Sequence, residues 1–493
     1  MNRGIQGAGV YLPRPRLQRA AVREALAWLS QHSSTIRGQR TYCQWDEDSL
    51  TMAVEAGRAC LTAPGASRPA ALSLASTTLP FADRSNAGVV AAALGLVPAC
   101  RTSDATGSLR AGTTALRDAI EGITDTLVIA SDARRAKPGS PQELAYGHGA
   151  AALAVGSENL LAEYSGGEST SVDFVDHHRA ATAEFDYAYE ERWIREEGYQ
   201  KLIPPVVQSL LKRVGVDPTA IMHTVIPLAG SFARRVAIAC GLKVETVRDS
   251  LHEHCGDTGS AHTLLMLADA LAHASAGDWL LAIGFGEGVD ALLFRATDTI
   301  AASAGRKESD ARVRNGSSAT GLASVAVALA SGRADSAYTR YLAHSGLLQV
   351  ESGMRAERDA RTAQPVAYRK RADITSFIGG RCARCDTVQF PRTRVCVNPE
   401  CRSMDTQVEH RLADTVGSVK TFTEDWLAYS PNPPLIYGNI DIGGGGNVFM
   451  EITDADPGEL AVGTPVRMMF RVKDVDRLRN YRRYFWKAAP LRS

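Results

Sequence analysis

Four closely spaced cysteines form the most specific chemical pattern in the chain. Cys382 and Cys385 make one short pair, and Cys396 and Cys401 make a second pair shortly after it. Two such turns place four thiolates at the corners of a tetrahedron around a soft cation. Because every position is a cysteine, no ligand position stays open for water, and the pattern predicts a structural zinc ion. A nucleic-acid-binding ribbon is an alternative on the motif alone.

Two groups of ionisable residues are candidates for acid–base chemistry. Asp257 lies in a Gly-Asp-Thr-Gly-Ser loop, and His262 comes early in the helix predicted after it. His177 and His178 follow a strand-like run and precede a segment rich in Glu, Asp and Tyr. Imidazole and carboxylate groups are the usual general acids and bases. A turn or capping aspartate, a packed histidine and a solvated acidic helix explain the same residues without catalysis.

The elements that must position these residues alternate in type up to about residue 300. Short apolar or β-branched runs, predicted as strands, alternate with Ala- and Leu-rich stretches, predicted as helices. This alternation predicts an α/β architecture with helices covering a central sheet. The predicted strands are Ala71–Ala75, Thr126–Ala130, Ala151–Val155, Thr224–Ile226 and Trp279–Ile283, and the predicted helices are Leu50–Cys60, Arg110–Glu121, Leu202–Val214 and Thr263–His273.

After Cys401 the sequence becomes all-β in character. Four strand-like runs are separated by turns rich in Gly, Pro and Asp, which is about the content of a five-stranded OB-type barrel. An Ala-rich helix is predicted within residues 303–335, and the charged residues 353–373 are predicted to form a crossover or linker. The four runs are Val416–Phe422, Pro434–Ile442, Val448–Ile452 and Pro465–Val472.

Composition narrows the class of protein. A formal net charge of +1 argues against a nucleic-acid-binding surface. No apolar run approaches the ~20 residues that span a bilayer, and the start of the chain turns polar and Pro-rich too early for a signal peptide. We therefore expect a cytoplasmic protein without a membrane or nucleic-acid partner. The five cysteines outside the quartet are scattered and are predicted to be small buried hydrophobic residues.

With these elements in place, the first 300 residues or so resemble the hydroxymethylglutaryl-CoA synthase branch of the thiolase superfamily, which also contains the type III ketoacyl synthases. The C-terminal part resembles the zinc-ribbon/OB-fold proteins that accompany thiolase-like enzymes. The matching stretches are Gly7–Pro13, Asp46–Ala56, Asp104–Leu116, Gly147–Ala152, Gly256–Ser260 and Gly277–Gly288 in the first part, and Gln389–Arg392 and Tyr484–Lys487 in the second.

The resemblance implies a fold, a domain order and a substrate. It implies an α/β body of layered αβαβα type, with an N-terminal half at 1–165 and a C-terminal half at 166–345. A linker at 346–375, a rubredoxin-like zinc ribbon at 376–405 and an OB-fold at 406–493 follow. The substrate implied is a thioester of coenzyme A or of an acyl carrier protein, and the implied assembly is a homodimer.

The family's catalytic residues do not carry over to this chain. The position of the nucleophilic cysteine is occupied by Leu109, and that of the histidine by Pro227–Leu228. The glutamate of the synthase branch falls near Thr77, and the asparagine of other members falls at Asp257. Leucine has no nucleophilic lone pair, which excludes an acyl-enzyme at this position. The adjacent Ser108 lacks an evident base.

Three functions are compatible with this pattern. The first is an enzyme that makes or breaks a carbon–carbon bond next to a thioester without an acyl-enzyme, by aldol or retro-aldol chemistry. This resembles the steroid side-chain aldolases, which pair a cysteine-less thiolase-like subunit with a zinc-ribbon/OB partner. The second is a non-catalytic thioester-binding or scaffold homologue, and the third is a hydroxymethylglutaryl-CoA synthase-like or ketoacyl synthase-like acyltransferase with a relocated nucleophile.

The aldol-type hypothesis assigns roles to particular residues. Asp257, His177, His178 or His262 would be the base. By resemblance, Gly286 and Gly288 would supply backbone near the thioester, and Arg37 and Arg40 would contact the phosphates of coenzyme A. These last two residues are also explained as ordinary exposed arginines.

Overall fold

The structure is a computed structural model that describes residues 2–29, 37–62, 68–300, 325–357 and 360–492. The predicted helix within 303–335 therefore lies largely outside the described residues, and α11 (Val325–Ala330) falls in its last part. Among the described residues, none of the helices is long and apolar enough to cross a membrane.

The body is built on a nine-stranded mixed sheet with the strand order β11-β12-β13-β8-β1-β7-β6-β4-β5. The parallel pairs β4–β5, β4–β6 and β11–β12 join strands that a helix separates in sequence, as crossover connections require. The strands are β1 Gly4–Tyr11, β4 Ala71–Ala75, β5 Arg101–Ala105, β6 Thr126–Ala133, β7 His148–Gly156, β8 Ala162–Ser171, β11 Ile221–Val225, β12 Trp279–Phe285 and β13 Gly288–Ala296.

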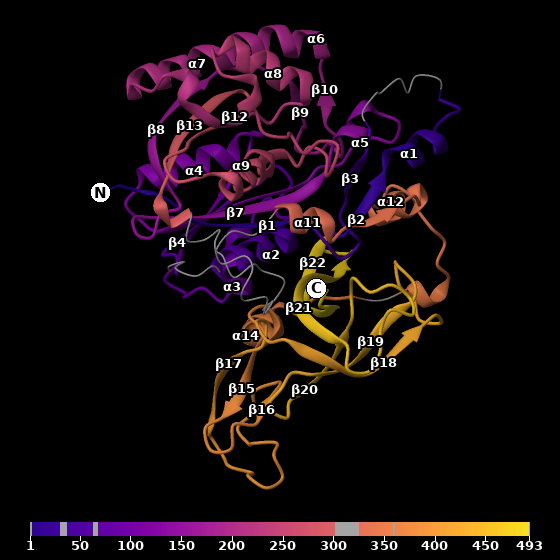
Figure 1. The fold of residues 1–493 in the computed structure, drawn as a ribbon. Helices are drawn as coiled ribbons and strands as arrows, with labels where there is room; N and C mark the ends of the chain where they lie inside the picture. The colour runs from indigo at the N-terminus through magenta and orange to yellow at the C-terminus, as the bar shows by residue number, and fades with distance from the viewer. Residues whose placement is uncertain (1, 30–36, 63–67, 301–324, 358–359, 493) are drawn as a thin grey trace.

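Helices cover this sheet in layers, which confirms the predicted fold (Figure 1). Helices α2 (Ser49–Leu61) and α3 (Asn86–Leu94) lie outside the N-terminal strands, and α7 (Gln200–Val214) and α8 (Gly230–Ala239) lie outside the C-terminal strands. Two further helices, α4 (Ala111–Glu121) and α9 (His262–His273), pack between the two sets of strands. An inner helix is covered on both faces, which is why α9 is buried over most of its length.

The remaining elements of the body are short. A three-stranded sheet contains β14 (Arg333–Asp335), β2 (Pro15–Gln18) and β3 (Gln39–Thr41), and a separate hairpin pairs β9 (His177–His178) with β10 (Tyr187–Ala188). The short helices of the body are α1 Arg19–Ala25, α5 Pro141–Ala145, α6 Glu191–Trp193 and α12 Tyr338–His344, and a π-helix at Ile194–Tyr199 joins α6 to α7. Two more short helices, α13 Gln364–Arg369 and α14 Arg371–Ile374, lie between the body and the ribbon.

The C-terminal part is all-β, as predicted. A ribbon sheet has the order β16-β15-β17, and a five-stranded sheet has the order β20-β19-β18-β21-β22. A bridge between Ile452 and Ala488 links the end of β20 to β22. The strands are β15 Ile378–Cys382, β16 Val388–Gln389, β17 Gln407–Arg411, β18 Gly417–Asp425, β19 Leu435–Asp441, β20 Asn447–Glu451, β21 Pro465–Asp476 and β22 Tyr481–Pro490. Strand β22 was not among the four predicted runs, because its basic first residues do not show the apolar pattern expected of a strand.

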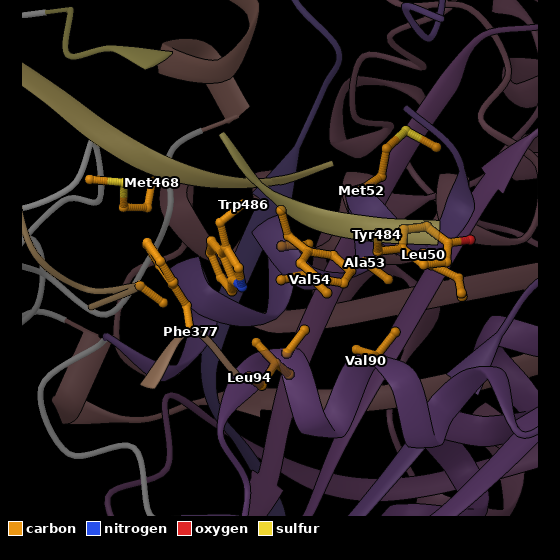
Figure 2. Packing of buried hydrophobic residues seen from close by; sticks show 14 of the residues in the cluster. Leu50, Met52, Ala53, Val54, Val90, Leu94, Phe377, Met468, Tyr484 and Trp486 are labelled. Atoms are coloured by element: carbon orange, nitrogen blue, oxygen red, sulfur yellow. The ribbon is translucent and has the colours of Figure 1, made fainter. Parts of the chain in front are cut away.

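The OB-type barrel shares a hydrophobic core with the body (Figure 2). Trp486 of β22 and Phe377, which precedes the ribbon, pack in one cluster with Val54 of α2 and Leu94 of α3. The indole N–H of Trp486 also donates a hydrogen bond of 2.8 Å to the carbonyl oxygen of Thr375. The C-terminal domains are therefore packed onto the outer face of the N-terminal half of the body.

A buried ion pair joins the same two parts. The ammonium group of Lys487 lies 3.0 Å from Asp46 Oδ2 and 2.8 Å from Glu451 Oε2, and the side chains of Lys487 and Asp46 are 4% and 1% exposed. Burial by itself would raise the pKa of Asp46, but the charges of Lys487 and Arg471 outweigh it and lower the pKa. The stabilisation from this lowered pKa is present above the ordinary value of 3.8 and is lost as the pH falls through the lowered pKa.

Replacing Lys487 by methionine should lower the free energy of unfolding by ~3–5 kcal/mol, because it leaves Asp46 buried without its cation. Chemical denaturation followed by circular dichroism measures this loss. The exposed Lys473→Met is the matched control and should change stability little. A double variant that also carries Asp46→Asn should recover part of the loss. If Lys487→Met is as stable as Lys473→Met, the interface does not depend on this pair.

Candidate active site

A cavity of about 240 Å³ opens where four segments of the body meet. They are the end of β4, the turn before α4, the segment that follows β8 and the turn between β12 and β13. The residues that line it are Thr77, Thr106, Gly107, Ser108, Leu109, Asp176, His177, His178, Arg179, Asp186, Gly286 and Glu287. The cavity therefore contains Leu109, which the resemblance places at the family's nucleophile position, and two of the predicted bases, His177 and His178.

The turn at Gly286 packs closely against the turn that carries Leu109. Ser108 Oγ donates a hydrogen bond of 2.8 Å to the carbonyl oxygen of Gly286, and Arg110 Nε donates another of 2.9 Å. A Cβ atom at position 286 would lie 2.7 Å from Ser108 Oγ and 3.0 Å from the backbone nitrogen of Leu109, so glycine is required there. Gly288 instead packs on the backbone of Thr170 and does not line the cavity.

His177 is oriented by its neighbour Asp176. Asp176 Oδ1 lies 2.9 Å from His177 Nδ1 and accepts a second hydrogen bond of 2.9 Å from the His177 backbone N–H. The Asp176 side chain is 11% exposed, so water competes little for this contact. A carboxylate on one ring nitrogen fixes the tautomer that leaves the other nitrogen as an acceptor, which is the state that a base requires.

His178 has different surroundings. It pairs with Tyr187 across the β9–β10 hairpin, and its ring centroid lies 5.9 Å from those of Tyr187 and Tyr189. The acidic run after the hairpin forms exposed ion pairs within its own helical segment, such as Arg192–Glu196. The helical part of the acidic run is therefore solvated, whereas Asp186 of the same run is 4% exposed and lines the cavity with the two histidines.

Asp257 is held in an ion pair beside the cavity rather than lining it. Arg134 Nη1 lies 3.2 Å from Asp257 Oδ2, and Arg134 Nη2 lies 2.8 Å from Asp186 Oδ2. Burial alone would raise the pKa of Asp257, but the charges of Arg134 and His262 outweigh it and lower the pKa. A carboxylate stabilised in this way is a weaker base.

His262 is packed at the start of α9 and has both ring nitrogens engaged. Its Nδ1 lies 3.2 Å from the backbone N–H of Thr258, and its Nε2 lies 2.9 Å from the carbonyl oxygen of Ser250. Burial lowers the pKa of this imidazole, and it does not line the cavity. The geometry matches the packed and capped alternative for His262.

The two arginines predicted to contact coenzyme A differ in position. Arg40 is 1% exposed; its Nη1 donates a 2.9 Å hydrogen bond to the carbonyl oxygen of Tyr146, and its guanidinium lies 4.4 Å from the ring centroid of Tyr341. A group buried in this way does not present its charge to a phosphate arriving from solvent, which argues against the predicted contact of Arg40 with the phosphates of coenzyme A. Arg37 is exposed and stays a prediction.

The four cysteines meet at one point, as their spacing predicted. Their sulfur atoms all lie within 4.8 Å of one another, with Sγ–Sγ distances of 3.8 Å for Cys382–Cys401 and 3.6 Å for Cys385–Cys396. A tetrahedron of thiolates around zinc, with Zn–S bonds of ~2.3 Å, has edges of about 3.8 Å. The residues therefore fit one structural zinc ion.

Comparisons with known proteins agree with this geometry. Residues 369–406 match the family described as the ChsH2 rubredoxin-like zinc ribbon domain, and residues 410–471 match the ChsH2 C-terminal OB-fold domain. The hydroxymethylglutaryl-CoA synthase of Methanopyrus kandleri is 28% identical over 312 residues, which cover 60% of this chain and 88% of that protein. The corresponding enzyme of Aeropyrum pernix is 29% identical over 317 residues, covering 60% and 86%.

Solved structures show the same fold. The 3-oxoacyl-(acyl carrier protein) synthase III of Pseudomonas aeruginosa superposes with a TM-score of 0.54 at 23% identity, covering 60% of this chain and 99% of its own. The HMG synthase of the curacin biosynthetic pathway, in complex with acetyl donor-ACP, has a TM-score of 0.58 at 16% identity, covering 83% and 100%. The body of the chain is therefore similar to hydroxymethylglutaryl-CoA synthases, and its C-terminal part is similar to the ChsH2 zinc ribbon and OB-fold domains.

Several residues in and around this cavity were not assigned a role from the sequence. Asp176 adjoins His177 in sequence, which was a usable signal for its role. Arg134 had no local signal, because the contacts that bring it to the site join distant segments, and Asp186 was visible only as one member of the acidic segment after the histidines. The sequence shows Glu287 between two glycines, but the tertiary structure is needed to show that it lines the same cavity as Leu109.

Proposed function

We propose that this protein is an acyl-thioester-dependent enzyme of the thiolase superfamily that forms or cleaves a carbon–carbon bond without an acyl-enzyme on cysteine. The comparisons support the coarser part, a condensing or acyl-transferring enzyme that uses a coenzyme A or carrier-protein thioester. The observation that supports the finer part is the cavity that holds Leu109 together with the Asp176–His177 pair.

Aldol and retro-aldol chemistry uses the groups that this cavity contains. In the cleavage direction, His177 takes the proton of a β-hydroxyl group, the oxygen forms a carbonyl, and the Cα–Cβ bond breaks to give the thioester enolate. The enolate oxygen needs a hydrogen-bond donor. Among the described residues, no acceptor bonds the backbone N–H of Leu109, which is therefore available to such an oxygen. No step requires a thiol.

The cysteines offer little support for a relocated nucleophile. None of the described cysteines lines the cavity, and four of the five outside the zinc ribbon, Cys43, Cys60, Cys240 and Cys255, are buried. Burial raises the pKa of Cys255 to about 12, so its thiolate is scarce at neutral pH. Ser108 donates its hydroxyl proton to a backbone carbonyl and has no histidine in contact among the described residues.

Intact mass spectrometry after mixing with acyl-CoA tests this point. We expect no mass increase on the protein during turnover, because Leu109 cannot accept an acyl group. A Leu109→Cys variant is the matched positive control for detecting an adduct at this position. A stoichiometric adduct on wild-type Ser108 or on any cysteine would favour the acyltransferase alternative. No adduct together with no turnover of any β-hydroxyacyl-CoA or β-ketoacyl-CoA would favour the scaffold alternative.

The assembly that we propose is a homodimer. Strand β5 ends the sheet of the body, and four of its five residues, Arg101 to Asp104, are exposed in the single chain. An unpaired sheet edge is a ready template for pairing with another strand. A second copy that pairs through β5 would cover this edge by a twofold, self-complementary contact.

A further inference from the structure

We propose that Glu287 is a second acid–base residue of this cavity and exchanges the proton at the α-carbon of the acyl thioester. This inference rests on the proposed function and adds to it the residue that transfers the proton at the α-carbon. Glu287 lies at the centre of the Gly286–Gly288 turn and lines the cavity with Leu109 and His177.

The backbone at Glu287 is in a conformation that favours glycine. Its φ angle is +50°, in the left-handed region, whereas both neighbours in the turn are glycines. A side chain with a β-carbon costs about 1–2 kcal/mol there relative to a relaxed conformation. A glycine would adopt this left-handed conformation at a lower conformational cost. The Glu287 side chain is therefore present although the backbone conformation favours glycine.

The turn is held in place by contacts that do not involve the Glu287 side chain. The backbone N–H of Gly286 donates to the carbonyl oxygen of Gly288 at 3.1 Å, and the backbone N–H of Val172 donates to the carbonyl oxygen of Glu287 at 3.2 Å. Ser108 and Arg110 bind the carbonyl oxygen of Gly286. The carboxylate is therefore presented on a fixed turn and is not needed to build it.

The carboxylate has no partner within the part of the chain that the structure describes. The two nearby arginines are already paired with other acids: Arg110 lies 3.0 Å from Asp290, and Arg179 lies 3.1 Å from Asp186. No hydrogen bond or ion pair of the Glu287 side chain occurs among the described residues. A half-buried carboxylate that lines a cavity and has no partner among the described residues is available to contact a substrate bound there.

The proton balance of the reaction assigns separate tasks to the two groups. In the condensation direction, the Glu287 carboxylate removes a proton from Cα of the acyl thioester, and the electron pair of that C–H bond forms the enolate. The enolate carbon then bonds to the carbonyl carbon of the second substrate. The π electrons of that carbonyl pass to its oxygen, which takes a proton from protonated His177. Solvent restores both side chains.

Deuterium exchange at Cα measures the proton transfer proposed for Glu287 separately from formation of the carbon–carbon bond. Acetyl-CoA and propionyl-CoA are incubated with the protein in D₂O, and mass spectrometry follows deuterium at Cα without a second substrate. Wild type should exchange, and Glu287→Gln and Glu287→Gly should exchange ~10²–10⁴-fold more slowly, as expected for loss of a positioned base. His254→Ala is the control and should exchange at the wild-type rate, because that side chain is 51% exposed and lies outside the cavity.

Stability separates a catalytic role from a structural one. Glu287→Gly should melt at the same temperature as wild type or higher, because it relieves the left-handed backbone. Asn159→Gly is the matched control, since Asn159 has the same φ of +50° at an exposed turn. Exchange at the wild-type rate in both Glu287 variants overturns the assignment of Glu287 alone. A wild-type protein that exchanges neither probe and cleaves no β-hydroxyacyl-CoA overturns the proposed function as well.

Discussion

Replacing His177 by alanine should lower the rate of carbon–carbon bond cleavage by ~10²–10⁴-fold, because a positioned general base contributes about that much. The geometry around His177 supports it as the general base in preference to the other predicted bases. His177 lines the cavity and its Nδ1 is held by Asp176, whereas Asp257 is paired with Arg134 and His262 is packed away from the cavity. The readout is formation of the shorter acyl-CoA from a panel of β-hydroxyacyl-CoAs.

Three further variants make this result specific. Asp176→Asn should also lower the rate, because it removes the acceptor that fixes the tautomer of His177. His178→Ala distinguishes the two adjacent histidines, and we expect the smaller effect there. His254→Ala is the control, since that side chain is 51% exposed and lies outside the cavity. Full activity in His177→Ala with loss in His178→Ala or Asp257→Asn would move the base to that residue.

Removing the zinc ion should unfold the ribbon and destabilise the whole C-terminal part. Structural zinc contributes ~10–16 kcal/mol of apparent binding free energy in small ribbons and fingers at neutral pH, and that binding is coupled to folding. The effect should extend beyond the ribbon, because Val388 of the ribbon and Phe377 beside it belong to the core shared with the OB-fold and helices α2 and α3. We therefore expect Cys396→Ser to lower solubility and the melting temperature together.

Elemental analysis, far-UV circular dichroism and limited proteolysis check this expectation. One zinc ion per chain should be found in the wild type and none in Cys396→Ser. Proteolysis should then remove the residues after the linker first. Cys100→Ser is the control, because Cys100 is a half-exposed cysteine outside the quartet. A metal-free preparation with the wild-type melting curve would contradict a structural role for the ion.

The sequence by itself determined the features that depend on short-range spacing. The zinc site follows from four cysteines whose positions within two turns fix the geometry. The alternating strands and helices of the body follow from local hydrophobic patterns, which is why β4 spans the predicted Ala71–Ala75 and α9 begins within one residue of the predicted start. The hypothesis that the family's nucleophile is replaced here also needed no coordinates, because it rests on the resemblance and on the side chain of Leu109.

The tertiary structure decided which ionisable groups act together. Arg134, far from both partners in sequence, pairs with Asp257 and Asp186, and this contact turns a predicted base into half of an ion pair. Packing likewise buries Arg40. The turn at Glu287 meets the turn at Leu109 only because β12 and β13 lie beside the start of α4. Burial and charge pairing depend on the residues that the rest of the chain places around a given side chain. Those neighbours are distant in sequence, so a local sequence pattern does not specify them.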